Sequence, residues 1–599
     1  MSDVQQDRLT STPRRRPTAE TLNSALEDHQ AWLNAGGADG QRADLSGLDL
    51  SRLDLRGVDL RGANLSQADL TDTNLRDAQL QNADLSDVRG LLSSQVGGAN
   101  LSGALLPESV LKFENLAGAA ESSRGAQGLF TSILLACAYT WITLGSTTDT
   151  QLVNKAALAS SKLPILGIDI PLVRFYMAAP ILLLCLYVYF HLGLQRLWED
   201  LSELPAVFPD GRSLDKKAPP WLLNSLVRPN FIRLRDDRPQ LSRWQAFISV
   251  ALAWGLVPIT LLFLWARFLR CHDLTVSGIH VLMLAGAIGA AVGFHRLTIN
   301  TLRGMGRRKF SWRKSWQDAR LQFILNSALS LVILGLLTFG AILGVNPDSE
   351  GRGVVVPSWS EKPLDVRHWA PRFFSFIGYS TFAHLDGTDL SVKPLNWNGE
   401  KATPQELGEV KGADLGGSNI RYGNVFGAFL VNAYLKEVKA EGCDMRESDL
   451  RRADLREARL VGVNFRSADL RGADLRWADL TGARLKEAKL EGATLNSADL
   501  TNACLDDARL ASSNEQGIKP TSLREANLHG ASLVNADLRG VDLRGANLAD
   551  AILTGVNFKG ANLVDVIGLT RKQVEVSIRD DTTKLPASLS PLATNVKSP

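Results

Sequence analysis

The sequence predicts a protein of mixed class, in which two coiled β-solenoids flank a transmembrane α-helical region. Leucine falls at every fifth position from Leu45 to Leu85, and the same spacing of leucine or another apolar residue returns from Leu415 to Leu510. Neither the helical period of 3.6 residues nor the strand period of 2 produces this spacing. The stretch between the two blocks is strongly apolar. A chain of 599 residues is also too long for one compact domain.

The five-residue period fits a coil with flat sides and sharp corners. Leucine and the alanine two places before it point inward, as in Ala63-Asn64-Leu65. The Asp or Asn between them is expected to bond to the backbone at the corner, as these residues do in turns. One coil cannot bury its own leucines, so coils must stack with strand-type hydrogen bonds about 4.8 Å apart. The predicted core includes Leu45, Leu50, Leu55, Leu60, Leu65, Leu70, Leu415, Leu450, Leu455, Leu470, Leu475, Leu480, Leu538, Leu543 and Leu548.

The repeated motif resembles the pentapeptide-repeat family, whose consensus is A(D/N)Lxx. Matching examples are Ala468-Asp469-Leu470, Ala473-Asp474-Leu475 and Ala478-Asp479-Leu480. The resemblance implies a right-handed quadrilateral β-helix with four pentapeptides per coil. The first block then makes roughly three coils and the second roughly eight. We expect residues 86–98 to form a loop, and interruptions around Asn396–Val410 and at Ala511–Pro520.

The open ends of such solenoids are exposed strand edges and need caps. Residues 21–33 have helical spacing and are expected to cover the first coil. The predicted organisation is a disordered N-terminus with a capping helix (1–42), a first β-helix (43–118), a transmembrane domain (129–345), a connector (346–382), a second β-helix (383–566), and a C-terminal cap and tail (567–599).

Five apolar segments are long enough to cross a membrane, which takes about 20 residues. The alternative, buried core helices, is disfavoured because the chain offers no amphipathic helices to bury them. Runs such as Leu204-Pro205-Ala206-Val207-Phe208-Pro209-Asp210-Gly211 resemble bacterial membrane-bound pentapeptide-repeat proteins, which implies an inner or plasma membrane location. The predicted spans are Leu129–Thr148, Leu172–Leu194, Gln245–Phe268, Leu274–Leu297 and Leu321–Val345.

The distribution of Lys and Arg predicts the orientation of these spans. The loops between the second and third spans and between the fourth and fifth are strongly basic, so both belong in the cytoplasm. The N-terminal block is then cytoplasmic, and the C-terminal block lies outside. An extra crossing near the aromatic stretch Trp369–Phe382 would put both blocks on one side, so the side of the C-terminal block stays open.

Candidate functional residues lie on the second block and in the spans. If coils repeat every twenty residues, three sets of basic side chains stack into ladders that could bind an anion or a partner. Neighbouring aspartates favour a mixed, solvated surface instead. Arg174 is charged just inside the second span, where a functional role competes with snorkelling to the interface. The ladders are Arg446, Arg466 and Lys486; Arg451 and Arg471; and Arg456 and Arg476.

Composition and motifs exclude several function classes. Five scattered cysteines without a CxxC pair argue against a zinc site or disulfide framework, and a net charge of +3 gives no general attraction to nucleic acid. We find no enzyme motif and expect no catalysis, cofactor or metal. The leading hypothesis is a membrane-anchored scaffold that binds an unidentified protein partner and membrane lipid. The alternative is a transporter, channel or signal-coupling protein with the repeats as sensors. Small residues in the spans (Gly289, Gly293, Gly340 and Gly344) allow helix packing within one subunit or oligomerisation equally well.

Overall fold

The computed structural model describes residues 14–108, 113, 115–154, 172–217, 242–302, 312–343, 366–377, 379–511 and 520–589. The chain divides into two compact units, each treated separately below. The first comprises Met1–Tyr139, Ile181–Thr260 and Met283–Ser330. The second comprises Thr140–Pro180, Leu261–Leu282 and Leu331–Pro599.

The first unit contains a four-sided coil, here called the N-terminal rod (residues 43–108). Its rungs are parallel bridges between a residue and the one twenty positions later, such as Asp44 with Asn64 and Asp49 with Asp69. A turn recurs once in every five residues, so one coil of twenty residues has four sides. The rungs are isolated bridges instead of long strands, because each side is too short to extend the ladder.

The corners explain which residues follow each leucine. The N–H of Leu48 donates to the carbonyl of Leu45, and Gly47 between them has φ +64°. A turn of this kind needs a positive φ at its third residue, which glycine adopts without strain. The side chain of Asp44 accepts from the N–H of Ser46 at 3.2 Å. The expected bond from Asp or Asn to the corner backbone is therefore present.

Helix α1 (Ala19–Asn34) covers the first coil, where the sequence predicts a cap. Thr18 is its N-cap, and its hydroxyl accepts from the N–H of Thr21. The Nδ1 atom of His29, which is fully buried, accepts from the N–H of Ala43 at 3.1 Å. Because Nδ1 accepts, the neutral ring carries its proton on Nε2. The helix thus satisfies a backbone donor at the open edge of the rod.

We expect the N-terminal cap to weaken at mildly acidic pH. Burial lowers the pKa of His29 below its ordinary value of 6.5, and Arg42 and Arg61 add to this against the attraction of Asp59. The unfolded state therefore binds more protons between the lowered pKa and about 6.5. Stability contributed by neutral His29 is present above about pH 6.5 and declines as pH falls through that window.

Hydrogen exchange of the Ala43 amide against pH measures this effect. In the His29→Gln variant, an amide oxygen can accept the same bond but does not titrate. Faster exchange at pH 5.5 than at pH 7.5, corrected for intrinsic rates, is expected in the wild type and not in the variant. Equal pH dependence in both proteins would contradict the role of His29.

The end of the N-terminal rod differs from the prediction. Residues 86–98 do not leave the coil as a loop: Arg89 still pairs with Asp69. The 3₁₀ turn η1 (Ser93–Val96) absorbs one extra residue, so later rungs join residues 21 apart, such as Gln79 and Asn100. Helix α3 (Asn115–Ser146) begins inside the range 43–118 predicted for the first β-helix, because alanines such as Ala117, Ala119 and Ala120, which favour helix, precede the apolar span.

A distant segment completes the last coil of the N-terminal rod. Val207 forms a parallel bridge with Asn100 and an antiparallel one with Ser213. Phe208, fully buried, meets Phe113 edge-on with ring centres 5.1 Å apart. The segment that follows helix α6 (Leu172–Ser202) and precedes α7 (Leu214–Lys217) therefore covers the edge of the coil.

Within the described part of the chain, five helices are long and apolar enough to cross a membrane: Leu116–Ser146, Leu172–Ser202, Trp244–Leu269, Leu274–Leu302 and Trp316–Leu343. Each overlaps one of the five predicted spans, although each differs from its predicted bounds at one end or both; the first, for example, ends at Ser146 and not at Thr148. Their elements are α3, α6, α9 (Ser242–Val250) with the π-helical turn η4 (Ala251–Gly255) and α10 (Leu256–Leu269), α11 (Leu274–Leu302), and α12 (Trp312–Leu343). The basic residues of the loops 218–241 and 303–311 lie outside the described residues.

Packing in the first unit uses the π-helical turn η4. A π turn leaves carbonyl groups without helical partners. The carbonyl of Trp254 accepts from the Tyr187 hydroxyl at 3.0 Å, and that of Ala253 lies 3.1 Å from His191 Nε2. On the facing side, a Cβ on Gly289 would meet the carbonyl of Phe323 at 2.7 Å. This small residue of α11 thus packs against α12 of the same chain, while Gly344 lies outside the described residues.

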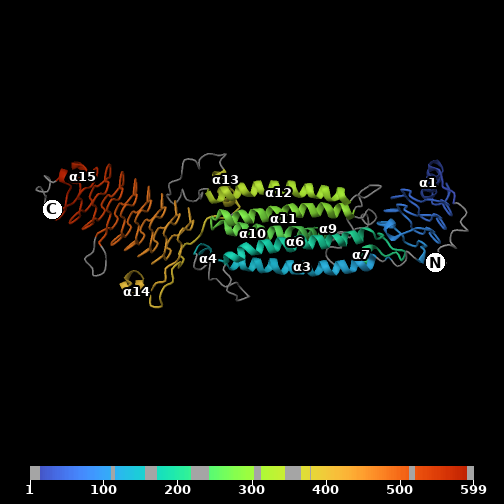
Figure 1. The fold of residues 1–599 in the computed structure, drawn as a ribbon, viewed down its shortest axis with the longest axis horizontal. Coiled ribbons are helices and arrows are strands. Elements are labelled where there is room, and N and C mark those ends of the chain that lie inside the picture. The colour runs from blue at the N-terminus through green and yellow to red at the C-terminus, as the bar shows by residue number, and fades with distance from the viewer. Residues whose placement is uncertain are drawn as a thin grey trace, which may run out of the picture. The chain divides into compact units, whose positions relative to one another are not determined.

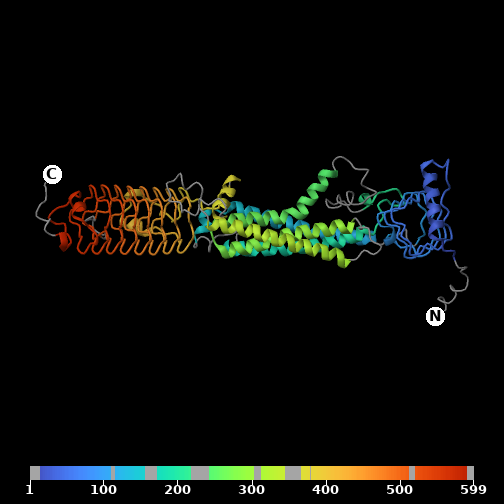
Figure 2. The same ribbon diagram turned by 90° about the horizontal axis from the view of Figure 1, so that it is seen from above.

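The second unit contains the longer coil, here called the C-terminal rod (residues 383–585), whose stacked rungs are clear in Figures 1 and 2. Rungs again join residues twenty apart, as in Asp414 with Tyr434. The first coil differs, because His384 pairs with Asn424 and Asp389 with Phe429, forty residues on. The residues between loop out as an insert (391–412) that contains an antiparallel bridge, the 3₁₀ turn η7 (Gly399–Lys401) and helix α14 (Pro404–Glu409).

Two further features shape the C-terminal rod. After the interruption predicted at 511–520, Thr494 pairs with Ser522, so the rungs resume with an offset of 28 residues in place of twenty. The tail continues the coil beyond 566, since Asn557 pairs with Ile578 and Asn562 with Lys584. Helix α15 (Arg571–Glu575) lies on this end, and the Gln573 amide donates to the carbonyl of Ala551 at 2.7 Å. The predicted cap is therefore partly a final coil.

The aromatic stretch before the C-terminal rod forms an amphipathic helix, α13 (Val366–Phe376), within the predicted connector. Its 11 residues reach about 16 Å at 1.5 Å per residue, about half of the hydrocarbon thickness of a membrane. Ala370 and Phe374 are buried, whereas Phe373 and Phe376 are exposed. This helix is too short to add a crossing.

Candidate functional site at the start of the C-terminal rod

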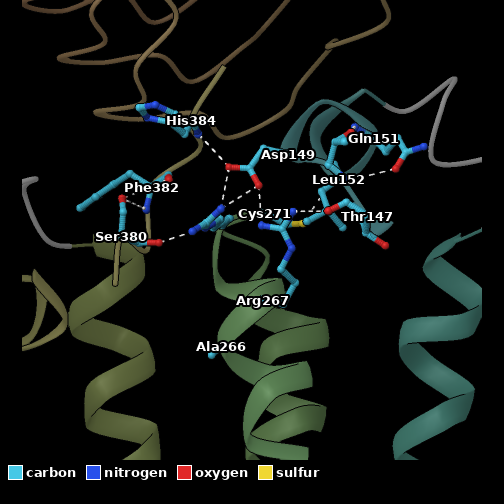
Figure 3. Close-up of polar contacts among 12 residues, drawn as sticks. Thr147, Asp149, Gln151, Leu152, Ala266, Arg267, Cys271, Ser380, Phe382 and His384 are labelled. Atoms are coloured by element: carbon cyan, nitrogen blue, oxygen red, sulfur yellow. Dashed lines mark hydrogen bonds and ion pairs between the residues drawn. The ribbon is translucent and has the colours of Figure 1, made fainter. Parts of the chain in front are cut away.

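A cluster of ion pairs and hydrogen bonds surrounds Asp149, at the start of the C-terminal rod (Figure 3). Helix α3 ends at Ser146, and the short helix α4 (Asp149–Val153) follows at once. Thr148 caps α4 through its hydroxyl, and Gln151 bonds back to the Thr148 backbone. This capping box fixes the direction of the chain where it leaves the apolar helix. It also places the Asp149 side chain among the ends of neighbouring elements.

Three donors from distant parts of the chain converge on the Asp149 carboxylate. Arg267, in the last turn of α10, donates to Oδ1, and Arg270, in the following turn, donates to both oxygens at 2.9 and 3.0 Å. The backbone N–H of His384, in the first coil of the rod, donates to Oδ2 at 2.9 Å. One buried carboxylate therefore connects α4, the α10–α11 turn and the rod.

The electrostatics of this cluster favour the charged forms. Burial alone would raise the pKa of Asp149, but the His384 N–H, Arg270 and Arg267 outweigh it and lower that pKa. Burial likewise opposes the charge on Arg270, yet Tyr379 and Asp149 keep its pKa above the ordinary value. The Asp149 side chain is only 6% exposed, so the ion pairs are shielded from solvent. Such a pair is strongly destabilising to break from one side only.

Backbone contacts extend the cluster on both sides. Arg267 donates to the carbonyl of Thr147, and Arg270 donates through Nε to the carbonyl of Ser380 at 3.0 Å. The Tyr379 hydroxyl donates to the carbonyl of Ala266, and Cys271 contacts the carbonyl of Leu152 at 3.7 Å. These bonds tie the residues just before the rod to the end of α10.

Helix α4 also closes the open end of the rod core. Val153 is 5% exposed and belongs to the same apolar cluster as Leu385 and Leu415. Ser418 donates to the carbonyl of Val153 at 3.4 Å, and the Asn154 side chain accepts from the N–H of Asp414 at 3.4 Å. The segment between the first two spans therefore acts as the N-terminal cap of the C-terminal rod. Nothing in the five-residue period predicts it.

The described side chains at this junction form a network of ion pairs and hydrogen bonds around one carboxylate. The carboxylate is fully engaged by arginines and a backbone amide, and burial raises the pKa of the neighbouring Cys271 thiol to about 12. Among the described residues, no group of three His, Cys, Asp or Glu side chains could hold a metal ion. We therefore regard the junction as the mechanical attachment of the rod to the helix ends.

The predicted core residues all lie inside the rods, where each leucine of the list is at most 3% exposed. The predicted basic ladders are different in character. Arg456, Arg471 and Arg476 each form a 2.6 Å ion pair with the aspartate two residues before them. Arg446 does the same with Asp444 at 2.8 Å. Arg466 and Lys486 approach acidic side chains of the next coil at 3.6 and 3.8 Å. These six ladder residues are therefore paired with acidic side chains.

Arg451 departs furthest from its expected outward position. Its side chain is 4% exposed because the insert folds over it. Its guanidinium donates to the carbonyl of Gly399 at 3.0 Å and lies 5.2 Å from the Trp397 ring. Lys489 pairs with Glu400 of the insert at 3.1 Å. Arg451 therefore holds the insert onto the rod and is not available to a partner. Arg174, in the first turn of α6, is exposed.

Sequence reasoning did not single out Asp149 or relate it to Arg267 and Arg270. The sequence did offer a signal: Asp149 comes just after the first apolar span, and Arg267 and Arg270 lie around the short turn after the third. Charges at span ends commonly pair. The pairing itself joins residues 118 and 121 positions apart, which no periodic pattern reveals.

Comparison with known proteins agrees with the geometry of the rods. The family model for pentapeptide repeats matches eight copies, over residues 32–62, 54–89, 411–452, 448–486, 478–514 and 521–566. Both rods therefore contain residues that match the model for pentapeptide repeats. No curated protein matches the chain in sequence.

Solved structures of pentapeptide-repeat proteins resemble parts of the chain. HetL, a pentapeptide-repeat protein involved in heterocyst differentiation regulation in Nostoc sp. strain PCC 7120, is 28% identical, with 28% of this chain and 84% of HetL covered and a TM-score of 0.19. Full-length QnrB1, a plasmid-mediated fluoroquinolone resistance protein, is 18% identical over 30% of this chain and 89% of its own, with a TM-score of 0.20. A pentapeptide-repeat protein of the Arabidopsis thaliana thylakoid lumen is 26% identical, with 26% of this chain and 86% of that protein covered and a TM-score of 0.12.

Proposed function

We propose that this protein is an integral membrane scaffold that presents two right-handed pentapeptide-repeat rods to protein partners. The observation that carries the proposal is the combination of five membrane-competent helices with two repeat rods, each bonded to helix ends of its own unit. We expect such rods to be stiff, because bridges join successive coils along their length. A rigid, patterned surface held at a membrane suits recruitment and not catalysis.

The attachments support opposite sides for the two rods. The N-terminal rod includes Val207, which follows the second apolar helix and opens the most basic loop. Basic loops stay in the cytoplasm, which favours a cytoplasmic N-terminal rod. His384 of the C-terminal rod is bonded to Asp149, after the first apolar helix, and Ser380, just before the rod, is bonded to Arg270, after the third. If each helix crosses once, these segments lie outside.

Exposed aromatic residues mark the surface most suited to a partner. Trp477 is 56% exposed and has φ +59°, a strained backbone for a residue other than glycine. Arg476 lies 5.5 Å from its ring, and Tyr434 is 45% exposed. Tryptophan, tyrosine and arginine are the residues most enriched at the energetic centres of protein interfaces. We expect partners to bind at this corner of the C-terminal rod.

Photo-crosslinking in intact cells tests the proposal. A photoreactive phenylalanine analogue at Trp477 is expected to give a discrete protein adduct, whereas the same analogue at exposed Ile552 of the rod serves as the matched control. Absence of any adduct at Trp477 above the level at Ile552 would contradict an interaction surface there. Membrane fractionation of the same cells checks that the chain is membrane-bound.

Labelling with a membrane-impermeant thiol reagent in the same cells determines on which side of the membrane each rod lies. Cys504 is a poor reporter because it is half-buried and burial raises its thiol pKa. Exposed Lys572→Cys and Gln30→Cys are better positions. We expect the first to be labelled in intact cells and the second only after lysis. Equal labelling of both before lysis, or of neither, would overturn the assignment.

The junction at Asp149 supports a second function, signal coupling. A displacement of α10 would pass directly to the first coil through Arg267 and Arg270. In this second function, a movement of the helices changes the position of the C-terminal rod, or a ligand bound to that rod moves the helices. Loss of response on uncoupling Asp149, with partner binding retained, would distinguish coupling from a passive scaffold.

A further inference from the structure

An apolar pocket lies beside the junction, within the second unit. Its volume is about 880 Å³, in the range of sites that hold small organic molecules, roughly 300 to 1,000 Å³. Four elements form its walls: the end of α3, the second half of α10, the last third of α12, and α13 with Ile377 and Tyr379 after it. The residues that line it are Trp141, Leu144, Gly145, Leu262, Phe263, Trp265, Ala266, Arg267, Leu334, Leu337, Phe373, Phe374, Ile377 and Tyr379.

The chemistry of the lining selects an apolar occupant. Only Arg267 and Tyr379 carry strongly polar side-chain groups, and both use them elsewhere: Arg267 on Asp149 and Thr147, and Tyr379 on the carbonyl of Ala266. The Trp265 indole donates to the Thr338 hydroxyl at 2.9 Å. A charged or strongly polar ligand would find no partner in the pocket and would lose its hydration. A hydrocarbon chain makes no hydrogen bonds to water and would pay no such penalty.

The position of the pocket indicates the source of that chain. Three of its walls are helices apolar enough to span a membrane. The fourth, α13, turns Phe374 into the pocket region while Trp369 and Phe376 remain exposed, as in helices that lie at a membrane surface. Arg372, next to the lining residue Phe373, is exposed. Lipid chains would meet the pocket laterally, with a basic side chain at the depth of the headgroups.

We propose that this pocket binds one acyl chain of a membrane phospholipid, whose phosphate lies at the level of Arg372. The inference rests on the proposed membrane location and deepens it by naming a specific lipid site. Because Arg267 both lines the pocket and binds Asp149, the bound chain packs against a residue that fastens the C-terminal rod. The lipid would thus be a structural cofactor of the attachment.

Filling the pocket from Gly145 tests the proposal. A Cβ on Gly145 would meet no atom within 4 Å, so Gly145→Phe directs a ring into the open space without displacing backbone. The matched control is Gly128→Phe on the same helix, where a Cβ also meets no atom within 4 Å and which lines no part of the pocket. Full-length proteins purified in detergent are titrated with phosphatidylglycerol, and retained lipid is counted by native mass spectrometry.

We expect one tightly retained lipid in the wild type and in Gly128→Phe, and at least tenfold weaker retention in Gly145→Phe. Equal retention in all three proteins, or none in the wild type, would overturn the proposal. A second pair of variants controls for misfolding. Leu337→Trp fills the pocket from α12, whereas Leu336→Trp places the same ring at an exposed position next to it that does not line the pocket. Membrane fractionation separates the two proposals, because a chain that is membrane-bound but retains no lipid refutes only the pocket.

Discussion

Replacing Asp149 with asparagine is expected to destabilise the attachment of the C-terminal rod by about 3–5 kcal/mol. The change removes the negative charge that pairs with Arg267 and Arg270, whose side chains are 17% and 20% exposed. Two guanidinium groups would then be largely buried without a counter-charge. The asparagine still offers one acceptor to the His384 N–H, so the loss is mainly electrostatic.

Thermal unfolding of the full chain in detergent, with hydrogen exchange of the His384 amide, measures this effect. The matched control is Asp542→Asn, because Asp542 pairs with Arg544 at 2.6 Å on a surface where the arginine is 46% exposed. An exposed pair of this kind contributes less than about 1 kcal/mol. Similar losses in both variants, or unchanged protection of the His384 amide in Asp149→Asn, would contradict the role of the junction.

The same carboxylate gives the attachment a dependence on pH. The pKa of Asp149 is lower in the folded state than its ordinary value near 3.8. The stability that it contributes is therefore fully present above that ordinary value, and it is lost as pH falls through the lowered folded-state pKa. The Asp149→Asn variant should lack this part of the acid dependence.

Truncation of a leucine in the middle of the C-terminal rod is the second large effect. Leu475→Ala is expected to cost about 2–5 kcal/mol, because Leu475 is fully buried and its neighbours are fixed by rungs on both sides. The walls of a four-sided coil cannot collapse inward without breaking those rungs. The cavity should therefore persist, and the cost should fall toward the upper part of the range.

Chemical unfolding of the full chain, with peptide-resolved hydrogen exchange, measures the truncation. Exchange should accelerate most in the coil of Leu475 and in the coils directly before and after it, because each coil contacts only its neighbours. Val461→Ala is the control: this valine is 38% exposed, so its truncation leaves no cavity. A uniform increase in exchange along the whole rod would indicate one cooperative unit and contradict the nearest-neighbour expectation.

The rods could be predicted in detail because their interactions have fixed offsets in the sequence. Each backbone rung joins a residue to the one twenty positions later, and each corner needs only the five residues around it. Where the offset changes, as at Gln79 with Asn100 or Thr494 with Ser522, a break in the leucine spacing marks the place. The sequence shows that the register breaks, but not that residues 86–98 stay in the coil.

The candidate site was hidden for the opposite reason. The sequence by itself determined the rods, their core leucines and five apolar helices, because burial of a periodic apolar pattern is a local property. Only the tertiary structure decided that α4 caps the C-terminal rod and that the insert covers Arg451. It also decided that Asp149 binds Arg267 and the His384 amide, 118 and 235 positions away. Those contacts depend on where the ends of separate helices meet in space, and no repeat in the chain encodes that meeting.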